Sequence, residues 1–200
     1  KKYIKDNPNA NLISFTQEDY NKWSESDESK ALRSKYGTDA AEMIQFINIV
    51  AQEIEEWLLV EEPGRKVTLI MFAYHKTELA PAKFNQTTNE YEPMDDSVKL
   101  RSNVAVIYAP IFANHYYDYY HPENVEVAET MKKWKSIADQ LFVWSYSTYF
   151  PYYFVPYDSF NSMQGKYQFA LENNTKYMFD QSQFNQAKGT DWYRLKQYLS

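Results

Sequence analysis

The chain has 200 residues, with 21 Lys and Arg against 27 Asp and Glu, so its formal net charge is −6. This length suits one domain that is large enough to bury a core. The acidic balance argues against a nucleic-acid binder, which needs a basic surface to meet phosphates. The absence of Cys excludes disulfides, thiolate metal sites and a Cys nucleophile. No apolar run approaches the length of a membrane span, so we expect no membrane-spanning segment.

The composition is unusual in its aromatic and Gly content. Aromatic residues make up 18% of the chain, with 19 Tyr among them, whereas Gly occurs only 4 times. With so few Gly the sequence contains neither a dinucleotide-binding fingerprint nor a P-loop. Tyr side chains are flat and carry a hydrogen-bonding group, so the excess suits either surfaces that stack on sugar rings or ordinary core packing.

The first predicted element is a strand at residues 11–16, an apolar run that ends in a polar cluster. Residues 20–37 are charged and rich in Ser, which favours a long loop or an irregular helix. A helix is then predicted from its cap at Thr38 or Asp39 to about Leu59, because apolar residues recur there every three or four positions.

The next predicted strand, residues 67–73, is continuously apolar, as in a parallel strand covered on both faces. Residues 76–98 are mainly polar with two prolines, and they predict a loop. Residues 104–109 predict a third strand, and Pro122 opens a second helix over about residues 123–138.

Residues 140–146 predict a further strand, followed by an aromatic loop over residues 149–157. A third helix is predicted over residues 159–173. Its predicted buried face consists of Phe160, Met163, Tyr167, Ala170 and Leu171. Residues 176–179 predict the last strand, and residues 190–199 predict a closing helix.

The alternation of strands and helices predicts an α/β fold, with a parallel sheet and right-handed crossovers. A doubly wound sheet and a TIM barrel both fit this order of elements. Each predicted strand ends in a polar or aromatic cluster before a long loop, as expected of a barrel whose site lies at the carboxyl ends of its strands. Five strands are too few to close an eight-stranded barrel.

One segment resembles a known family. Residues 141–146 (LFVWSY), followed by Phe150, Tyr153 and Pro156, resemble the VWDY…F…Y…P core of a bacterial family catalogued as domain of unknown function 4838. Four further stretches in the same order resemble other parts of that family: residues 13–19, 46–51, 69–74 and 177–181. The family pattern has Asp where this chain has Ser145, and Glu where it has Asp180.

Members of that family look like glycoside hydrolases with a TIM-barrel catalytic region. The resemblance implies that residues 1–200 form a single glycoside-hydrolase-like (β/α) domain, the later part (about five strands) of such a barrel. It implies a carbohydrate partner and, for the first three strands, the missing N-terminal part of the same protein or a second copy. It also implies an extracellular or cell-envelope location in a bacterium and requires no cofactor.

Glycoside hydrolysis needs two carboxyl groups, and the sequence offers three candidates. Glu18 and Asp19 follow the first strand, and an adjacent acidic pair at this place resembles substrate-assisted barrel glycosidases. We expect Glu18 or Asp19 to be the general acid. Asp180, at the end of the last strand, is expected to assist it, either as the second carboxylate or by orienting substrate hydroxyls. Neighbours on a strand point to opposite faces, so only one of the pair faces a pocket unless the strand has already ended. A capping role for Glu18 or Asp19 and a surface turn at Asp180 remain alternatives.

The predicted substrate-binding residues are Tyr74, His75, Trp144, Tyr146, Tyr149 and Gln181. Trp144 and Tyr146 lie two residues apart, hence on one face of their strand, where they suit either stacking on a sugar or packing in the core. Tyr74 and His75 end the second strand, where His75 is suited to bind a sugar hydroxyl, to tune an acid or to hold structure.

No metal site is expected, because His115 and His121 lie six residues apart without a carboxylate cluster. Two functions stay open. One is a glycoside hydrolase that acts on an extracellular polysaccharide or glycan by carboxylate acid/base chemistry. The other is a non-catalytic carbohydrate-binding domain with an aromatic sugar platform. A structural domain that uses the Tyr-rich loops as a protein interface is a third option.

Overall fold

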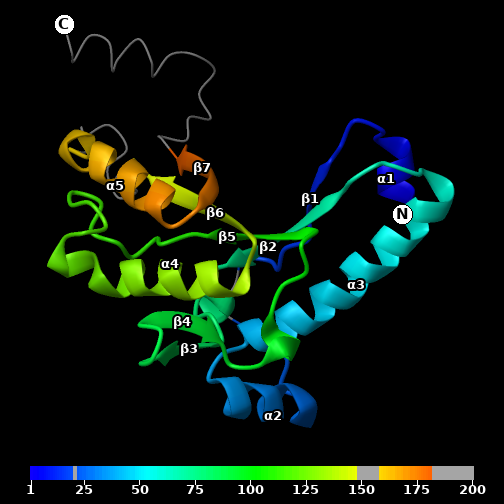
Figure 1. Cartoon of the computed structure of the whole chain (residues 1–200), viewed down its shortest axis with the longest axis horizontal. Helices are drawn as coiled ribbons and strands as arrows, with labels where there is room; N and C mark the ends of the chain where they lie inside the picture. Colours follow the sequence, from blue (N-terminus) through cyan, green and yellow to red (C-terminus); the bar gives the residue numbers. More distant parts are fainter. Residues whose placement is uncertain (20–21, 148–157, 182–200) are drawn as a thin grey trace, which may run out of the picture.

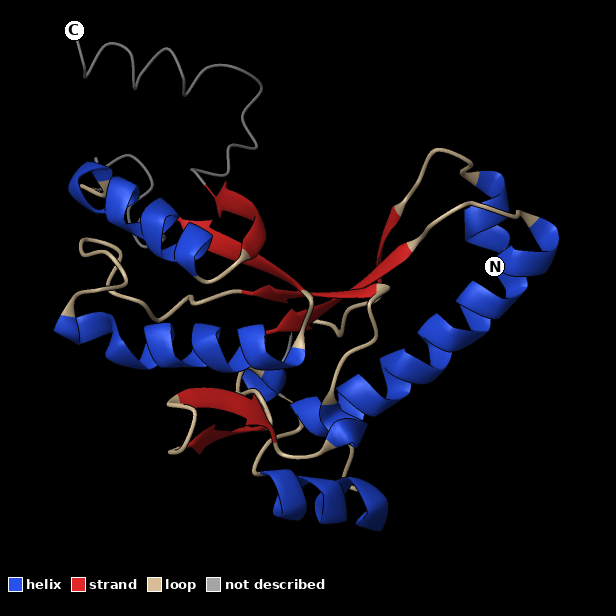
Figure 2. Cartoon of the chain, in the orientation of Figure 1, coloured by secondary structure: helices blue, strands red, loops and turns tan. Residues whose placement is uncertain are grey.

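A computed structural model of the chain describes residues 1–19, 22–147 and 158–181. Its centre is a sheet of five parallel strands in the order β1-β2-β5-β6-β7. The strands are β1 (Leu12–Ser14), β2 (Thr68–Ala73), β5 (Val104–Tyr108), β6 (Gln140–Tyr146) and β7 (Thr175–Gln181). The sheet curls into a trough with the helices along its outer side, so the described chain forms half a barrel (Figures 1 and 2). The predicted parallel (β/α) repeat is confirmed.

In the part of the chain that the structure describes, five α-helices accompany the sheet. They are α1 (Lys2–Asp6), α2 (Asp27–Tyr36), α3 (Ala40–Glu61), α4 (Val125–Ile137) and α5 (Phe160–Glu172). The region predicted as a loop or irregular helix contains α2, a regular helix. Ser26 caps it by accepting a hydrogen bond from the Ser29 amide at 3.2 Å, and Gly37 ends it with a positive φ of 71° that suits Gly. The predicted aromatic loop and closing helix lie outside the described residues.

The prediction of a plain loop over residues 76–98 was wrong, because this segment contains an antiparallel hairpin. Its strands are β3 (Ala82–Asn85) and β4 (Glu90–Pro93). The ring of Phe84 packs edge-on against that of Tyr91 with centroids 5.2 Å apart, and the Tyr91 hydroxyl donates to Glu129 of α4. The turn lacks the Asn-Gly or Asp-Gly pair that marks a short hairpin in a sequence. The hairpin could not be predicted because the sequence does not show that it packs against α4.

The core lies between the sheet and the helices α3 and α4. Leu69, Met71 and Ala73 of β2 are buried on this outer face, together with Trp134 of α4. The residues that alternate with them in β2 are only half-buried. The sheet therefore has one covered face and one concave face that is partly open, rather than the two covered faces predicted for this strand.

α5 buries mostly different residues from those predicted, and Ala170 is the one predicted residue that is buried. Phe160, Tyr167 and Leu171 are exposed, at 80%, 42% and 70%. Its buried residues are Ser162, Lys166, Phe169 and Ala170. Polar contacts explain this orientation, because Ser162 and Lys166 both donate to the carbonyl oxygen of His115, at 2.8 and 2.9 Å.

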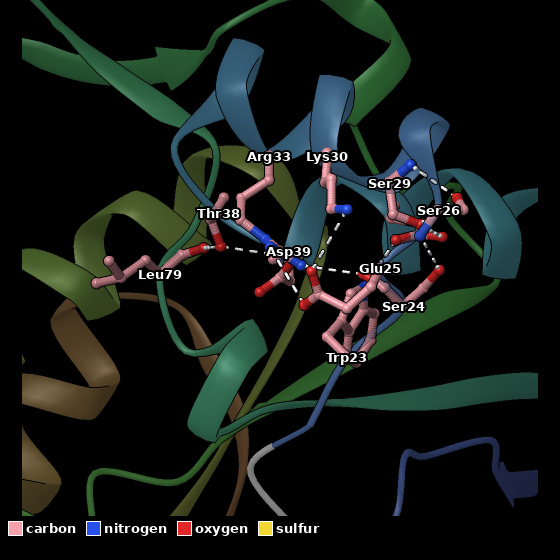
Figure 3. Close-up of polar contacts among 12 residues, drawn as sticks. Trp23, Ser24, Glu25, Ser26, Ser29, Lys30, Arg33, Thr38, Asp39 and Leu79 are labelled. Atoms are coloured by element: carbon pink, nitrogen blue, oxygen red, sulfur yellow. Dashed lines mark hydrogen bonds and ion pairs between the residues drawn. The ribbon is translucent and has the colours of Figure 1, made fainter.

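Side-chain hydrogen bonds join the corner between α2 and α3 to the rest of the molecule (Figure 3). Arg33 Nε donates to Oδ1 of the buried Asp39 at 2.5 Å. Thr38 Oγ1 donates to the carbonyl oxygen of Leu79 at 2.7 Å. The second bond ties the start of α3 to the segment that follows β2. No helix in the described part of the chain is long and apolar enough to cross a membrane.

Candidate functional site

A pocket of about 330 Å³ opens at the carboxyl ends of the parallel strands. This is the edge at which a parallel barrel carries its site. Its wall includes the segments that follow β1, β2 and β5 and the ends of β6 and β7. The lining residues are Gln17, Glu18, Asp19, Phe72, Tyr74, Ala109, Ile111, Trp144, Tyr146 and Gln181.

Glu18 and Asp19 both line the pocket because β1 ends earlier, at Ser14. The alternation of a strand therefore does not separate their side chains. Gln17 fastens this segment to the end of β2, since its Nε2 donates to the Tyr74 carbonyl at 3.2 Å and to Thr77 Oγ1 at 2.7 Å. The acidic pair thus directly follows a residue that is bonded to the end of β2, and both of its side chains are exposed.

Two ring side chains hold Asp19. His75 Nε2 lies 3.1 Å from Asp19 Oδ1, and the rings of His75 and Tyr74 are 3.9 Å apart. The pKa of Tyr74 is raised by burial, by the Asp19 charge and by a hydrogen bond to Asp19. The backbone of His75 has a positive φ of 52°, which is uncommon for a residue other than Gly. His75 is not among the residues that line the pocket, and it contacts two residues that do, Asp19 and Tyr74.

Trp144 and Tyr146 lie on the concave face of β6, side by side with Phe179 and Gln181 of β7. Trp144 Nε1 donates to Gln181 Oε1 at 2.9 Å, and Phe179 meets the Trp144 ring at 4.6 Å. These contacts fix the half-buried indole in the pocket wall. Tyr146 is buried, and burial raises its pKa.

The structure does not bring Asp180 to this pocket. Asp180 alternates with Phe179 and Gln181, so its side chain leaves β7 on the outer face. There it accepts a hydrogen bond from Ser147 and lines, with Lys166, a cavity of about 10 Å³, the size of one water. The expected pairing with Glu18 or Asp19 therefore does not occur in this structure. Tyr149 lies outside the described residues.

Sequence reasoning missed one carboxyl group near the pocket, that of Glu78. Glu78 follows the short helix η1 (His75–Thr77) at the end of β2. Its side chain is half-buried, and burial raises its pKa. Tyr74 and His75 were predicted because they end the second strand, and Glu78 lies only three residues beyond His75. Among the described residues, no group of three or more side chains is arranged to hold a metal ion.

The fold and the site define an α/β protein built on half of a parallel barrel, with an acidic, aromatic-lined pocket at the carboxyl ends of its strands. The model of one family, described as domain of unknown function DUF4838, matches residues 1–200, and the chain belongs to this family. No curated protein and no solved structure gives a match.

Proposed function

We propose that this chain is a glycoside hydrolase region that acts on an extracellular polysaccharide or glycan. The observation that carries the proposal is the pocket, which gathers Glu18 and Asp19 with the ring of Trp144 at one strand edge. Glycoside hydrolysis needs carboxyl groups beside the sugar, and an aromatic face packs well against a pyranose ring.

In the proposed mechanism Glu18 gives its proton to the departing glycosidic oxygen. Asp19, which His75 and Tyr74 hold in place, stabilises the positive charge that develops at the anomeric carbon. Water then adds its oxygen to that carbon, and the proton that the water loses returns to the Glu18 carboxylate. Trp144, Tyr146 and Gln181 bind the sugar.

Replacement of the proposed acid tests this function. The unmodified chain is assayed on a panel of 4-nitrophenyl glycosides, together with Glu18→Gln and the control Glu126→Gln, which removes the same charge from the exposed side of α4. We expect Glu18→Gln to lower kcat by about 10²-fold or more, the size of a general-acid contribution, and the control to match the unmodified chain. Equal rates for all three proteins would rule out Glu18 as the acid.

A non-catalytic carbohydrate-binding domain is the second candidate. Two observations favour it: Ser145 and Asp180 depart from the family pattern, and Asp180 lies away from the pocket. Binding of a glycan without turnover in the full-length protein supports this candidate over the enzyme.

We also propose what covers the open side of the half-barrel. Among the described residues, β1 and β7 each pair with one neighbour, so each offers an edge to a further strand. The N-terminal part of the same protein, or a second copy, would complete the barrel from these edges. An extracellular or cell-envelope location in a bacterium suits a protein that acts on such glycans.

A further inference from the structure

The wall of the pocket carries charge of one sign. Its acidic residues are Glu18 and Asp19, and none of the wall residues that the structure describes is Lys, Arg or His. Among the ion pairs of the described residues, none includes Glu18, and the one that includes Asp19 is with His75. A protonated His75 balances one of the two carboxylates and leaves the other. The pocket therefore attracts positive charge and repels negative charge.

The side-chain amide of the wall residue Gln17 adds to this negative potential. Its Nε2 donates to the Tyr74 carbonyl and to Thr77 Oγ1. The carbonyl only accepts hydrogen bonds, so this contact fixes which end of the amide is the nitrogen. Oε1 of Gln17 is buried and has no hydrogen-bond partner among the described residues. The positive end of this amide is thus paired, and its negative end is not.

Asp19 has room for a further hydrogen-bond donor. A carboxylate accepts about four hydrogen bonds, and His75 and Tyr74 account for two at Asp19. The Asp19 side chain is 81% exposed, so a ligand at the pocket can reach its remaining positions. An ammonium group offers three donors and a full positive charge, so it binds a carboxylate more strongly than a neutral hydroxyl does.

The rings of the wall suit a cation as well as a sugar. Trp144 gives its N–H to Gln181, so its further contribution to a ligand comes from the ring. The Phe72 and Phe179 rings meet the indole at 64° and 66°, so neither lies flat on it. The face of an aromatic ring carries partial negative charge and attracts a cation within about 6 Å.

We propose that the pocket selects sugars that carry a free amine at C2, and that Asp19 is the residue that pairs with this amine. The inference rests on the proposed function, in which Asp19 lies beside the anomeric carbon. C2 is bonded to that carbon, so an ammonium group at C2 comes within reach of the same carboxylate. The pairing also offsets the repulsion between the ammonium charge and the positive charge that develops at the anomeric carbon. The substrate class is thus a glycan that contains 2-amino-2-deoxy sugars, whereas a uronic acid is repelled.

The test compares matched methyl glycosides by calorimetry at pH 6, where the sugar amine is protonated. Glucosamine, N-acetylglucosamine and glucose differ only at C2, and glucuronic acid differs from glucose by a carboxylate at C6. We expect glucosamine to bind roughly 5-fold more tightly than glucose or N-acetylglucosamine, the size of an exposed ion pair. Glucuronic acid should bind most weakly. Added salt should reduce these differences, because it screens exposed charges.

Two variants locate the source of the preference. Asp19→Asn keeps an acceptor of the same shape but removes the charge, so we expect it to bind glucosamine and glucose about equally. Glu126→Gln removes the same charge from the exposed side of α4, and it should keep the preference of the unmodified chain.

Each result has a distinct meaning. Equal binding of glucosamine and glucose by the unmodified chain, or binding of glucuronic acid as tight as that of glucose, overturns the inference and leaves the proposed function intact. An Asp19→Asn protein with a native near-ultraviolet spectrum and the full preference for glucosamine overturns the role of Asp19. Failure of every glycoside to bind the unmodified chain overturns the proposed function, and the inference with it.

Discussion

Individual side chains at the pocket owe their roles to contacts with residues far away in the sequence. Asp19 is held by His75, and Trp144 is fixed by Gln181. The same is true of buried groups away from the pocket. His115 is buried beside the ammonium of Lys166, and its ring meets Tyr146 at 5.4 Å. Such contacts give single substitutions predictable effects.

The His115 ring predicts an acid-sensitive fold. Burial and the Lys166 charge lower its pKa from 6.5 to about 4, against a smaller opposing effect of the Pro110 and Ile111 carbonyls. Between pH 6.5 and about pH 4 this His is protonated in the unfolded chain but neutral in the folded chain. The free energy of unfolding therefore decreases as the pH is lowered through this range. We expect a loss on the order of 3 kcal/mol. Urea unfolding at pH 7 and pH 4.5 measures it.

Two His variants provide the comparison. His115→Phe keeps the ring but cannot be protonated, so its stability should change less between the two pH values. His121→Phe, which replaces the ring stacked on Tyr117, should keep the acid sensitivity of the unmodified chain. An unchanged pH response in His115→Phe would show that other groups cause the loss.

At the residue scale, the sequence predicted most of the pocket wall. Glu18, Asp19 and Tyr74 were predicted because side chains at the ends of parallel strands meet at one edge. The sequence did not show that the Asp180 side chain lies on the face of the sheet away from the pocket. Which residues of a strand face the pocket depends on the register of that strand with its neighbour. Glu78 was missed because its distance from the pocket depends on how the turn after β2 folds.

Helices and strands take their orientation from polar contacts as well as from apolar periodicity. The apolar pattern of α3 predicted its buried face, including Ile44, Ile47 and Ala51. The predicted face of α5 was wrong except for Ala170, because Lys166 and Ser162 turn toward the His115 carbonyl. The sequence does not show that this carbonyl group lies beside α5, because the loop after β5 brings it there only in the folded chain.

Gly165 of α5 allows the close approach of that loop. A Cβ atom at this position would lie 2.3 Å from Oδ2 and 2.6 Å from Cβ of Asp118. Gly→Ala in a helix usually stabilises by roughly 1 kcal/mol, but overpacking costs about 1–3 kcal/mol. We therefore expect Gly165→Ala to lower the free energy of unfolding, as measured by urea denaturation. Gln164→Ala, at an exposed position of the same helix, should stay within about 0.5 kcal/mol of the unmodified chain. A stabilised Gly165→Ala would contradict the packing of α5 on this loop.

The described part of the molecule is a trough with helices on the outside and a partly open concave face. Tyr177 and Phe179 on β7 are 60% and 44% exposed there. The five strands of the main sheet and their parallel direction could be predicted from the sequence, because apolar runs alternated with helices. The exposure of the concave face could not be predicted, because it depends on the curl of the sheet and on what packs against that face.

The open concave face predicts self-association of the isolated chain. Apolar surface and free strand edges favour contact between copies. We expect light scattering at increasing concentration to give a mass above the 23.8 kDa of one chain. Tyr177→Glu should lower this mass, whereas Phe160→Glu, which changes an exposed ring on the outer helix α5, should not. A single-chain mass at every concentration, or an equal effect of both variants, would contradict the role of the concave face.

Carbohydrate binding in the pocket is tested most directly by the indole N–H signals of the 5 Trp residues in a ¹H–¹⁵N spectrum. Trp144→Phe assigns the Trp144 signal, and Trp134, which is fully buried, serves as the internal reference. The spectrum is recorded while methyl glycosides and glycan fragments are added. If the pocket binds sugar, the Trp144 signal shifts in a saturable way and the Trp134 signal stays in place. A bound sugar that leaves the Trp144 signal unmoved would contradict this assignment of the site.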